Sequence, residues 1–363
     1  MDVYVMGIGL HPAASRIANK RLEEVVFETS RAALDDAGVA RADIDHVTIA
    51  GCDELDGRSI SSMLLSAPAG AYLRDEIKCT DSGLTGLCLA SQRIRSGLFD
   101  LGLVASWNKS SIAPVEDVMR MRCEPFFTRP VGLNMSITDG LFAQAVSQQL
   151  GITEEDVNET VAGLLRKAAR NPRRAADALP VAAHLAGSDY VAAPLRRGQQ
   201  APISDGAVAF VLASASWVAR HPGHKPLARI TGAGWSSDGY SLGAERLGGL
   251  NSFRKAWADA LGKAGIDNAR QLDLIELDSQ TGYHAVAYRK ALGLEQGTRL
   301  SPSGGPFAQN PYFCTGLVNA AECVLQIAGR AGAVQLPGVR RAAAHGCHGY
   351  AQQGNVVTIF EGA

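Results

Sequence analysis

Residues 75–97 read DEIKCTDSGLTGLCLASQRIRSG, and this stretch decides the fold. Its polar first part predicts an extended entry, and Ser82 followed by Gly83 is a typical start of a helix. The apolar residues that follow, as far as Ile94, recur three or four positions apart and alternate with small residues, which predicts a helix that can be packed on several sides. The sequence therefore indicates a central, buried helix, with Cys79 just before its first turn.

Cys79 has two interpretations. A thiol at the first turn of a helix lies among unpaired backbone N–H groups, and the positive end of the helix dipole favours its thiolate. Free cysteines are also often small hydrophobic residues of a core, and Cys88, in the middle of the same helix, is predicted to be one. The stretch alone leaves open whether Cys79 is a nucleophile or a buried thiol.

The composition predicts a soluble globular protein. The chain has 363 residues, 46% of them hydrophobic, which is enough for a large core and suggests two domains or one duplicated domain. Lys and Arg total 35 against 36 for Asp and Glu, so no overall basic field favours nucleic acid or an anionic membrane. The segment RNPRR at 170–174 is expected to be a solvated helix end, with contact to a phosphorylated cofactor as the alternative. Neither a secretion leader nor an apolar run of about 18 residues is present, so membrane spanning is not expected.

The cysteines are scattered and odd in number, and they form no C-x-x-C pair. This spacing argues against a disulfide framework and against a zinc site, so no metal is expected. Because free thiols persist in a reducing compartment, the chain is expected to be cytoplasmic. The seven cysteines are Cys52, Cys79, Cys88, Cys123, Cys314, Cys323 and Cys347.

One strand–helix unit occurs twice in the sequence. Each copy begins with an apolar strand pattern and continues into a helix that ends at a glycine, a natural left-handed cap. The repeat predicts two halves of βα type, 1–225 with an insertion at about 107–200 and 226–363, which pack as one rigid body because no flexible linker separates them. The matching segments are VYVMGIGL (3–10) with LARITGAGW (227–235), AALDDAG (32–38) with ADALGKAG (258–265), and the triplet TGL at 85–87 with 315–317.

Six segments, in order across nearly the whole chain, resemble motifs of the thiolase superfamily, nearest to thiolases of the sterol-carrier-protein-x type. The resemblance implies a duplicated five-layered αβαβα fold, commonly dimeric, with the active site where the two halves meet. It also implies that the protein acts on acyl-coenzyme A thioesters, so coenzyme A is part of the substrate and no bound cofactor is expected. The six segments are SGLTGLCLASQRIRSGLFDLGLVA (82–105), FAQAVSQQLGITEEDVNETVAGLLRKAARNP (142–172), PISDGAVAFVLAS (202–214), GIDNARQLDLIELDSQT (265–281), SPSGGPFAQNPYFCTGL (301–317) and HGCHGYAQQGNVVTIFE (345–361).

The resemblance maps only part of the thiolase catalytic set onto this chain. Without a gap, the nucleophile position falls on Thr80, and a one-residue bulge would restore Cys79. Asn310 replaces the histidine base; its amide donates hydrogen bonds but cannot take the thiol proton and become charged. Asp278 stands at the Asn-or-His position, where a carboxylate would repel an oxyanion and would serve as a base only if burial raised its pKa. Cys347 keeps the C-x-G position, and we expect it to be the second acid–base group.

Several neighbours of these positions are further candidates. Gly349 and Gly305 are expected to bring the backbone close to the ligand. His348 and His345 are candidates for a displaced base, although histidines in a Gly-rich turn are more often structural.

Tyr283 and Tyr312 lie in the two motifs that have lost their usual residues. Similar steroid side-chain aldolases of the superfamily use tyrosines as acid and base. Because the ordinary pKa of tyrosine is about 10, such a residue needs a shifted pKa or a matched partner. The alternative is a packing residue with a satisfied hydroxyl.

Three functions follow, and the first is preferred. The first is a divergent thiolase or condensing enzyme that makes or breaks a carbon–carbon bond through an acyl-Cys79 intermediate. The second is a retro-aldolase acting on a β-hydroxyacyl-CoA with a small OB-fold zinc-ribbon partner, and the third is a catalytically silent scaffold subunit. A homodimer or heteromer is expected, joined along the strand LGLVASWN (101–108), because an uncovered strand edge favours aggregation.

Overall fold

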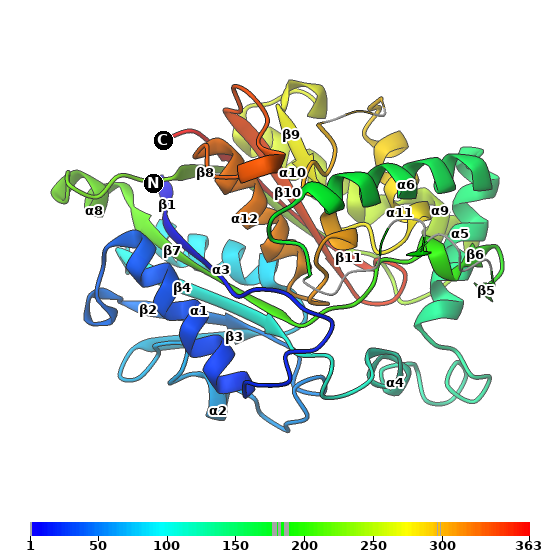
Figure 1. Cartoon of the computed structure of the whole chain (residues 1–363), viewed down its shortest axis with the longest axis horizontal. Coiled ribbons are helices and arrows are strands. Elements are labelled where there is room, and N and C mark those ends of the chain that lie inside the picture. The colour runs from blue at the N-terminus through cyan, green and yellow to red at the C-terminus, as the bar shows by residue number, and fades with distance from the viewer. Residues whose placement is uncertain (1, 176–179, 181–182, 185–188, 296, 298) are drawn as a thin grey trace.

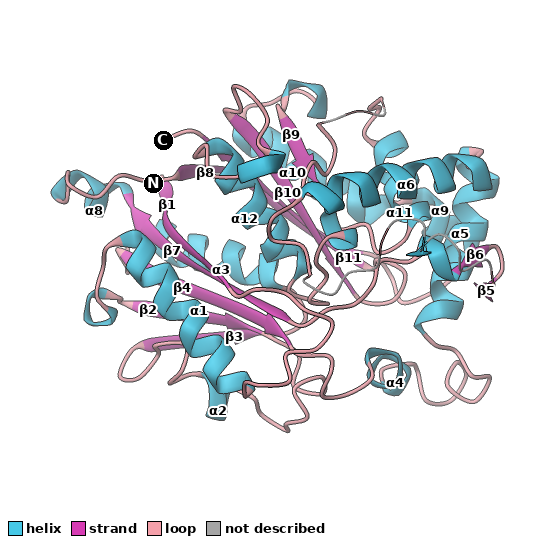
Figure 2. Ribbon diagram, in the orientation of Figure 1, coloured by secondary structure: helices cyan, strands magenta, loops and turns pink. Residues whose placement is uncertain are grey.

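The computed structural model describes residues 2–175, 180, 183–184, 189–295, 297 and 299–363. Strands from both halves form a nine-stranded sheet in the order β3-β2-β4-β7-β1-β8-β11-β10-β9, and helices cover it (Figures 1 and 2). Its strands are β1 (Val3–Leu10), β2 (His46–Ala50), β3 (Asp75–Cys79), β4 (Leu101–Asn108), β7 (Gly206–Ser214), β8 (Ala228–Ser237), β9 (Leu274–Glu276), β10 (Arg341–His348) and β11 (Gly354–Glu361), and β5 (Tyr190–Ala192) pairs separately with β6 (Leu195–Arg196).

Helices frame the sheet and form most of the insertion. They are α1 (Leu22–Ala37), α2 (Ser62–Leu65), α3 (Gly83–Arg95), α4 (Val115–Met121), α5 (Met135–Leu150), α6 (Glu154–Arg170), α8 (Ala215–Arg220), α9 (Ala244–Gly249), α10 (Asn251–Ala264), α11 (Gly282–Ala291) and α12 (Thr315–Ile327). None of the helices among the described residues combines the length and apolarity needed to cross a membrane.

The two halves repeat one pattern of strands. The first half has the order β3-β2-β4-β7-β1, and the second has β9-β10-β11-β8, which matches β2-β4-β7-β1. A parallel bridge from Ile275 to Leu300 lies beside β9, where the first half has β3. The halves join where Val3–Val5 pair antiparallel with Ala228–Ile230. The boundary between 225 and 226 stays a prediction.

In both halves, glycines let a helix lie directly on the first strand. A side chain at Gly7 or Gly9 of β1 would come within 3.0 Å of α1 backbone atoms, and one at Gly232 or Gly234 of β8 would do the same with α10. Because a Cβ atom does not fit there, only glycine allows this close packing. The G-x-G pairs therefore set the distance between sheet and helix in both copies.

Helices α3 and α12 pack against each other at the centre of the molecule (Figure 1). The Ser82 side chain caps α3 by accepting a 3.3 Å hydrogen bond from the Thr85 backbone N–H. Gly316 of α12 lies so close to Gly346 of β10 that a Cβ at Gly316 would be 2.7 Å from the Gly346 Cα. The structure confirms the expected buried helix after Gly83.

Two segments differ from expectation. The expected edge strand, β4, lies inside the sheet between β2 and β7, and every residue of it is buried. That prediction was wrong because an apolar run on both faces indicates an interior strand; the edge in this half is β3. Arg173, expected at a solvated helix end, donates from Nε to the buried Glu322 carboxylate at 2.8 Å. This ion pair ties the end of the insertion to α12.

Candidate active site

Cys79 ends β3, and its thiol lies beneath α3. A Cβ at Gly86, one turn into the helix, would be 3.5 Å from Sγ of Cys79 and 3.1 Å from Cβ of Ala50. The Sγ–Ser82 carbonyl oxygen distance is 3.8 Å. Burial raises the pKa of Cys79 to about 12, so the thiol is neutral at physiological pH. The N-terminus of α3 does not lower the pKa of this thiol enough to offset the loss of solvent around it.

Thr80, the gap-free match to the nucleophile, is exposed at the surface. The following residue, Asp81, has a φ of 68°, in the left-handed region. One carboxylate oxygen of Asp81 forms an ion pair with Arg122. The other oxygen, Oδ1, is buried and has no hydrogen-bond partner among the described residues. Sequence reasoning missed Asp81, whose unusual φ is a possible signature of a functional turn.

Residues from the second-half motifs form one hydrogen-bonded network. The side chain of Gln280 donates to Oδ1 of Asp278 at 2.6 Å and to Oδ1 of Asn310 at 3.1 Å. Asn310 returns a hydrogen bond from Nδ2 to Oε1 of Gln280 at 2.8 Å, and it accepts one from the Thr315 hydroxyl at 2.7 Å. Asn310 is therefore held in a fixed orientation by two neighbouring side chains.

Cys347 joins this network through its backbone. Its N–H donates to Oδ2 of Asp278 at 3.1 Å, and its Sγ lies 3.7 Å from the Asp278 carbonyl oxygen. Burial raises the pKa of Asp278 to about 6, while burial and the neighbouring Asp278 raise the pKa of the Cys347 thiol well above its usual range. Both Asp278 carboxylate oxygens already accept hydrogen bonds, so this carboxylate organises the motif loops.

The two histidines of the last motif have different environments. His345 is fully buried, with Nε2 2.9 Å from Oδ1 of Asn355 and Nδ1 accepting from the Asp278 backbone N–H at 3.3 Å. The His348 ring lies against Gly354, and its Nδ1 is buried without a hydrogen-bond partner among the described residues. Burial lowers the pKa of His348, and the charge of Asp81 opposes that shift. His345 is thus integrated into the fold, whereas His348 has an unused ring nitrogen.

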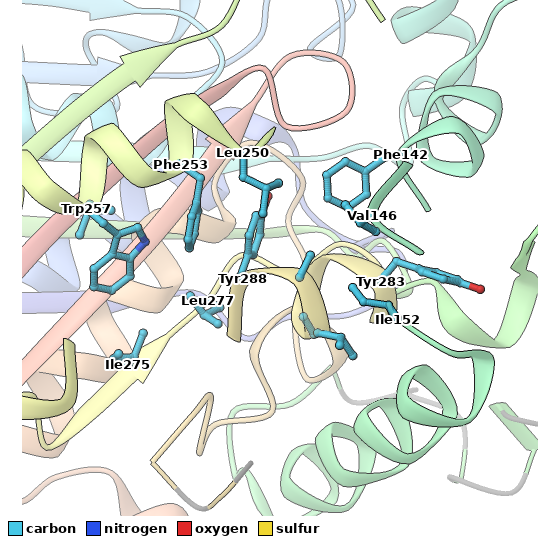
Figure 3. Packing of buried hydrophobic residues seen from close by; sticks show 14 of the residues in the cluster. Phe142, Val146, Ile152, Leu250, Phe253, Trp257, Ile275, Leu277, Tyr283 and Tyr288 are labelled. Atoms are coloured by element: carbon cyan, nitrogen blue, oxygen red, sulfur yellow. The ribbon is translucent and has the colours of Figure 1, made fainter. Parts of the chain in front are cut away.

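The two candidate tyrosines lie in different places. Tyr283 packs in the core beside Phe142 and Ile152 (Figure 3), and burial raises its pKa to about 12. The charged groups that influence it are Glu154 and Arg196, rather than the network around Asp278. The structure therefore does not bring Tyr283 together with the other candidates.

Tyr312 lies next to the motif network and at a cavity. Burial raises its pKa well above 10, and the nearby acidic groups Asp139, Cys347 and Asp278 raise it further. The phenol is consequently protonated over the physiological pH range, and it can donate a hydrogen bond or a proton. Among the candidates, Tyr312 has a phenol that can donate a proton, belongs to a motif segment and also lines a cavity.

A cavity of about 640 Å³ opens in front of Tyr312 and Gln280. Its other walls come from the insertion and from the chain before β7. Neither thiol candidate, Cys79 or Cys347, belongs to its lining among the described residues. The polar side chains that line it are Ser15, Ser110, Ser111, Glu116, Ser136, Asp139, His184, Arg197, Gln200, Gln280 and Tyr312.

Asp139 of α5 is a second acidic group in this cavity, and sequence reasoning missed it. It is 7% exposed, and burial together with the charge of Glu116 raises its pKa to about 8. Its position, four residues into a helix with little amphipathic pattern, gave no motif signal. Only the fold shows that Asp139 and Tyr312 line the same cavity.

The two candidate ligand glycines have the expected backbone freedom. Gly349 has a φ of 76° and Gly305 a φ of 54°, both in the left-handed region that favours glycine. A Cβ at Gly305 would lie 3.3 Å from the Leu277 carbonyl oxygen, next to the Asp278 network. Their ligand contacts stay a prediction. The described residues contain no group of His, Cys, Asp and Glu side chains suited to a metal ion.

Two of three comparisons with known proteins find proteins of the thiolase type. No protein-family model matches the chain. An acetyl-CoA acetyltransferase from Methanothermobacter thermautotrophicus is 24% identical over 375 residues, which cover 96% of each chain. Sterol carrier protein 2 from Bos taurus is 24% identical over 381 residues, which cover 94% of this chain and 69% of that protein.

The comparison with solved structures also finds a thiolase. The crystal structure of human mitochondrial 3-ketoacyl-CoA thiolase superposes with a TM-score of 0.81, at 16% identity, and covers 100% of this chain and 99% of that chain. This likeness extends over both halves of the sheet and includes the insertion. Together with the sequence relatives, which align over nearly the whole of this chain, it shows that the chain has the thiolase fold and is similar to thiolases in sequence.

Proposed function

We propose that this protein makes or breaks a carbon–carbon bond in an acyl-coenzyme A thioester, by acid–base chemistry at the cavity beside Tyr312. The names of the relatives, an acetyl-CoA acetyltransferase and a 3-ketoacyl-CoA thiolase, support the acyl-CoA substrate and the general reaction. The observation that supports the finer assignment is that Tyr312 lines the cavity together with Gln280 of the Asp278 network. Coenzyme A enters as part of the substrate.

The geometry favours the retro-aldol form of this reaction over an acyl-Cys79 intermediate. Attack by Cys79 would require a thiolate, yet burial raises the pKa of this thiol to about 12. The residue at the usual position of the base, Asn310, cannot accept the thiol proton and is already hydrogen-bonded to Gln280 and Thr315. A buried thiol without a base is a weak nucleophile.

In the proposed cleavage, the substrate is a β-hydroxyacyl thioester. Its hydroxyl proton leaves, the oxygen electrons form a carbonyl, and the bond between the α and β carbons breaks. The electron pair becomes a thioester enolate, which takes a proton at carbon to give a shortened acyl thioester. Tyr312 is suited to the last step because its raised pKa keeps it protonated until the enolate forms. Condensation is the same sequence in reverse.

The test compares three variants on a series of β-hydroxyacyl-CoA thioesters of increasing chain length, with the shortened thioester and the carbonyl product measured by mass spectrometry. We expect Tyr312→Phe to lower turnover by about 100-fold or more, the usual loss when a general acid is removed. Tyr283→Phe and Cys79→Ala are matched controls that should keep most of the activity.

The same experiment separates the alternatives. Loss of turnover in Cys79→Ala with retention in Tyr312→Phe would return the chemistry to an acyl-enzyme thiolase. A wild-type chain without activity, beside an active homologous partner subunit, would identify it as a scaffold. If activity appears only with a small OB-fold zinc-ribbon protein added, the retro-aldolase stands and needs that partner.

A further inference from the structure

The cavity contains an acidic side chain, Asp139, that forms no hydrogen bond with any residue that the structure describes. Asp139 is 7% exposed, and no described residue donates a hydrogen bond to its side chain. Buried polar groups in proteins are nearly always hydrogen-bonded, and an unpaired buried carboxyl destabilises the fold. Asp139 lines the cavity, so a ligand bound there would lie next to this residue.

The surroundings of Asp139 suit proton transfer. Glu116 of α4 lines the same cavity and accepts a 3.3 Å hydrogen bond from the Ser136 backbone N–H. Tyr312 lines the same cavity, and the charge of Asp139 contributes to the raised pKa values of Tyr312, Tyr288 and Cys347. These last three groups stay neutral at physiological pH.

Other titratable groups also line the cavity. His184 and Arg197 line it, and burial lowers the pKa of His184. Glu116 is half-buried, and burial raises its pKa. Among the described lining residues, Asp139 shares the cavity with one other carboxyl, Glu116, and two neighbouring carboxyls resist simultaneous ionisation.

We propose that Asp139 is the general base of the carbon–carbon cleavage, and that the cavity binds acyl thioesters with a hydroxyl or keto oxygen at the β carbon. This inference rests on the proposed function. The Asp139 carboxylate takes the β-hydroxyl proton as the carbonyl forms and the carbon–carbon bond breaks, and Tyr312 protonates the enolate carbon. The proton on Asp139 then returns to the Tyr312 oxygen directly or through water, so the cycle needs no oxidant or reductant.

The acidities of the two residues support this division of roles. Burial raises the pKa of Asp139 to about 8, close to the pH at which a base works best, whereas Tyr312 stays protonated. Environments that separate two pKa values in one site are typical of an acid–base pair. The polar lining of serines and glutamines also suits an oxygen-bearing acyl group better than a plain alkyl chain.

The first arm of the test measures turnover. Asp139→Asn keeps the shape but cannot accept the proton, so we expect kcat to fall by about 100-fold or more with a much smaller change in KM. The rise of the rate toward pH 8 should also disappear in Asp139→Asn. Asp139→Glu should restore part of the turnover and part of the pH dependence. Asp117→Asn, the same change on an exposed neighbour of Glu116, is the matched control and should behave as wild type.

The second arm measures binding and stability without turnover. Wild type should be stabilised against heat more by 3-hydroxybutyryl-CoA than by butyryl-CoA, and Asp139→Asn should lose that preference. Because the folded pKa lies above the unfolded one, ionisation of Asp139 lowers the stability of the wild type as pH rises from about 4 to above 8. Asp139→Asn should therefore melt at a higher temperature than wild type at pH 9 and at nearly the same temperature at pH 4.

The outcomes distinguish the two proposals. Asp139→Asn with wild-type turnover and pH profile overturns the base assignment and leaves the proposed function intact. An Asp139-dependent preference for 3-hydroxybutyryl-CoA without any cleavage by wild type overturns the proposed function and keeps the oxygen-binding site. If wild type shows neither a preference for 3-hydroxybutyryl-CoA nor turnover, both proposals are overturned. A melting temperature of Asp139→Asn below that of wild type at pH 9 would identify Asp139 as structural.

Discussion

At the scale of single residues, burial decides which acidic groups can react. Cys79 and Asp139 both lose solvent, but the half-buried thiol lies against α3, whereas Asp139 lines a cavity. Desolvation raises the pKa of each. For a thiol this shift removes the reactive form at neutral pH, whereas for a carboxyl it brings the pKa into the working range of a base.

The state of Cys79 can be measured by alkylation. Its pKa rises from 9.0 to about 12, so its thiolate fraction at pH 8 should be about a thousandfold below that of an ordinary cysteine. We expect iodoacetamide to modify Cys79 in the native chain slower by roughly that factor than in the urea-unfolded chain, as followed by peptide mapping. Equal rates in the two states would show an activated thiol and would contradict the buried position.

The sequence predicted some site residues better than others, for a physical reason. Asp278, Asn310 and Cys347 lie in motif segments, and the structure brings them into one hydrogen-bonded network. Asp81 and Asp139 carry no motif signal, because their environments depend on a left-handed backbone and on packing between distant segments. Tyr283 and Tyr312 were equivalent in sequence, and only the fold separates a core tyrosine from one at a cavity.

At the scale of elements, small residues set how the layers pack. The apolar spacing after Gly83 predicted the central helix, and the paired glycines of β1 and β8 explain why α1 and α10 lie so close to the sheet. The edge position of β3 was not predicted. Its polar, alternating sequence is typical of an edge, but a prediction from single strands does not include the order of the sheet.

The glycine packing predicts opposite effects for two substitutions on neighbouring elements. Gly234→Ala places a Cβ against the α10 backbone, so it should lower the free energy of unfolding by about 1–3 kcal/mol. Gly262→Ala, on the open face of α10, should raise it by about 0.5–1 kcal/mol, because alanine is the better helix former. Urea titration of both variants measures these changes. A neutral Gly234→Ala would show that the helix does not lie this close to β8.

At the scale of the whole molecule, the exposed edge of the sheet bears on assembly. β3 ends the sheet in the first half, and Ile77 in this strand is 41% exposed. Two large apolar side chains in the segments before it, Met63 and Leu73, are 85% and 80% exposed. Free strand edges with apolar neighbours favour pairing with another chain. We therefore expect a homodimer or a heteromer that covers β3.

Light scattering of the purified chain tests this assembly. At micromolar concentration, we expect a mass of at least twice that of one chain, or a co-purifying partner that accounts for the difference. Ile77→Lys should shift the chain toward monomer by introducing charge at the edge, whereas Leu98→Lys, an equally apolar-to-charged change at an exposed site after α3, should not. A stable monomer without a partner would contradict the expectation.

The mass of the intact protein during turnover distinguishes acid–base cleavage from covalent catalysis most directly. The chain is incubated with 3-hydroxybutyryl-CoA and, separately, with acetyl-CoA, then quenched in acid, and its mass and peptide map are recorded. Because the half-buried Cys79 thiol is neutral and Asn310 cannot act as its base, we predict an unmodified chain while 3-hydroxybutyryl-CoA is consumed. An acyl group on Cys79, formed as fast as product appears, would contradict the proposed reaction.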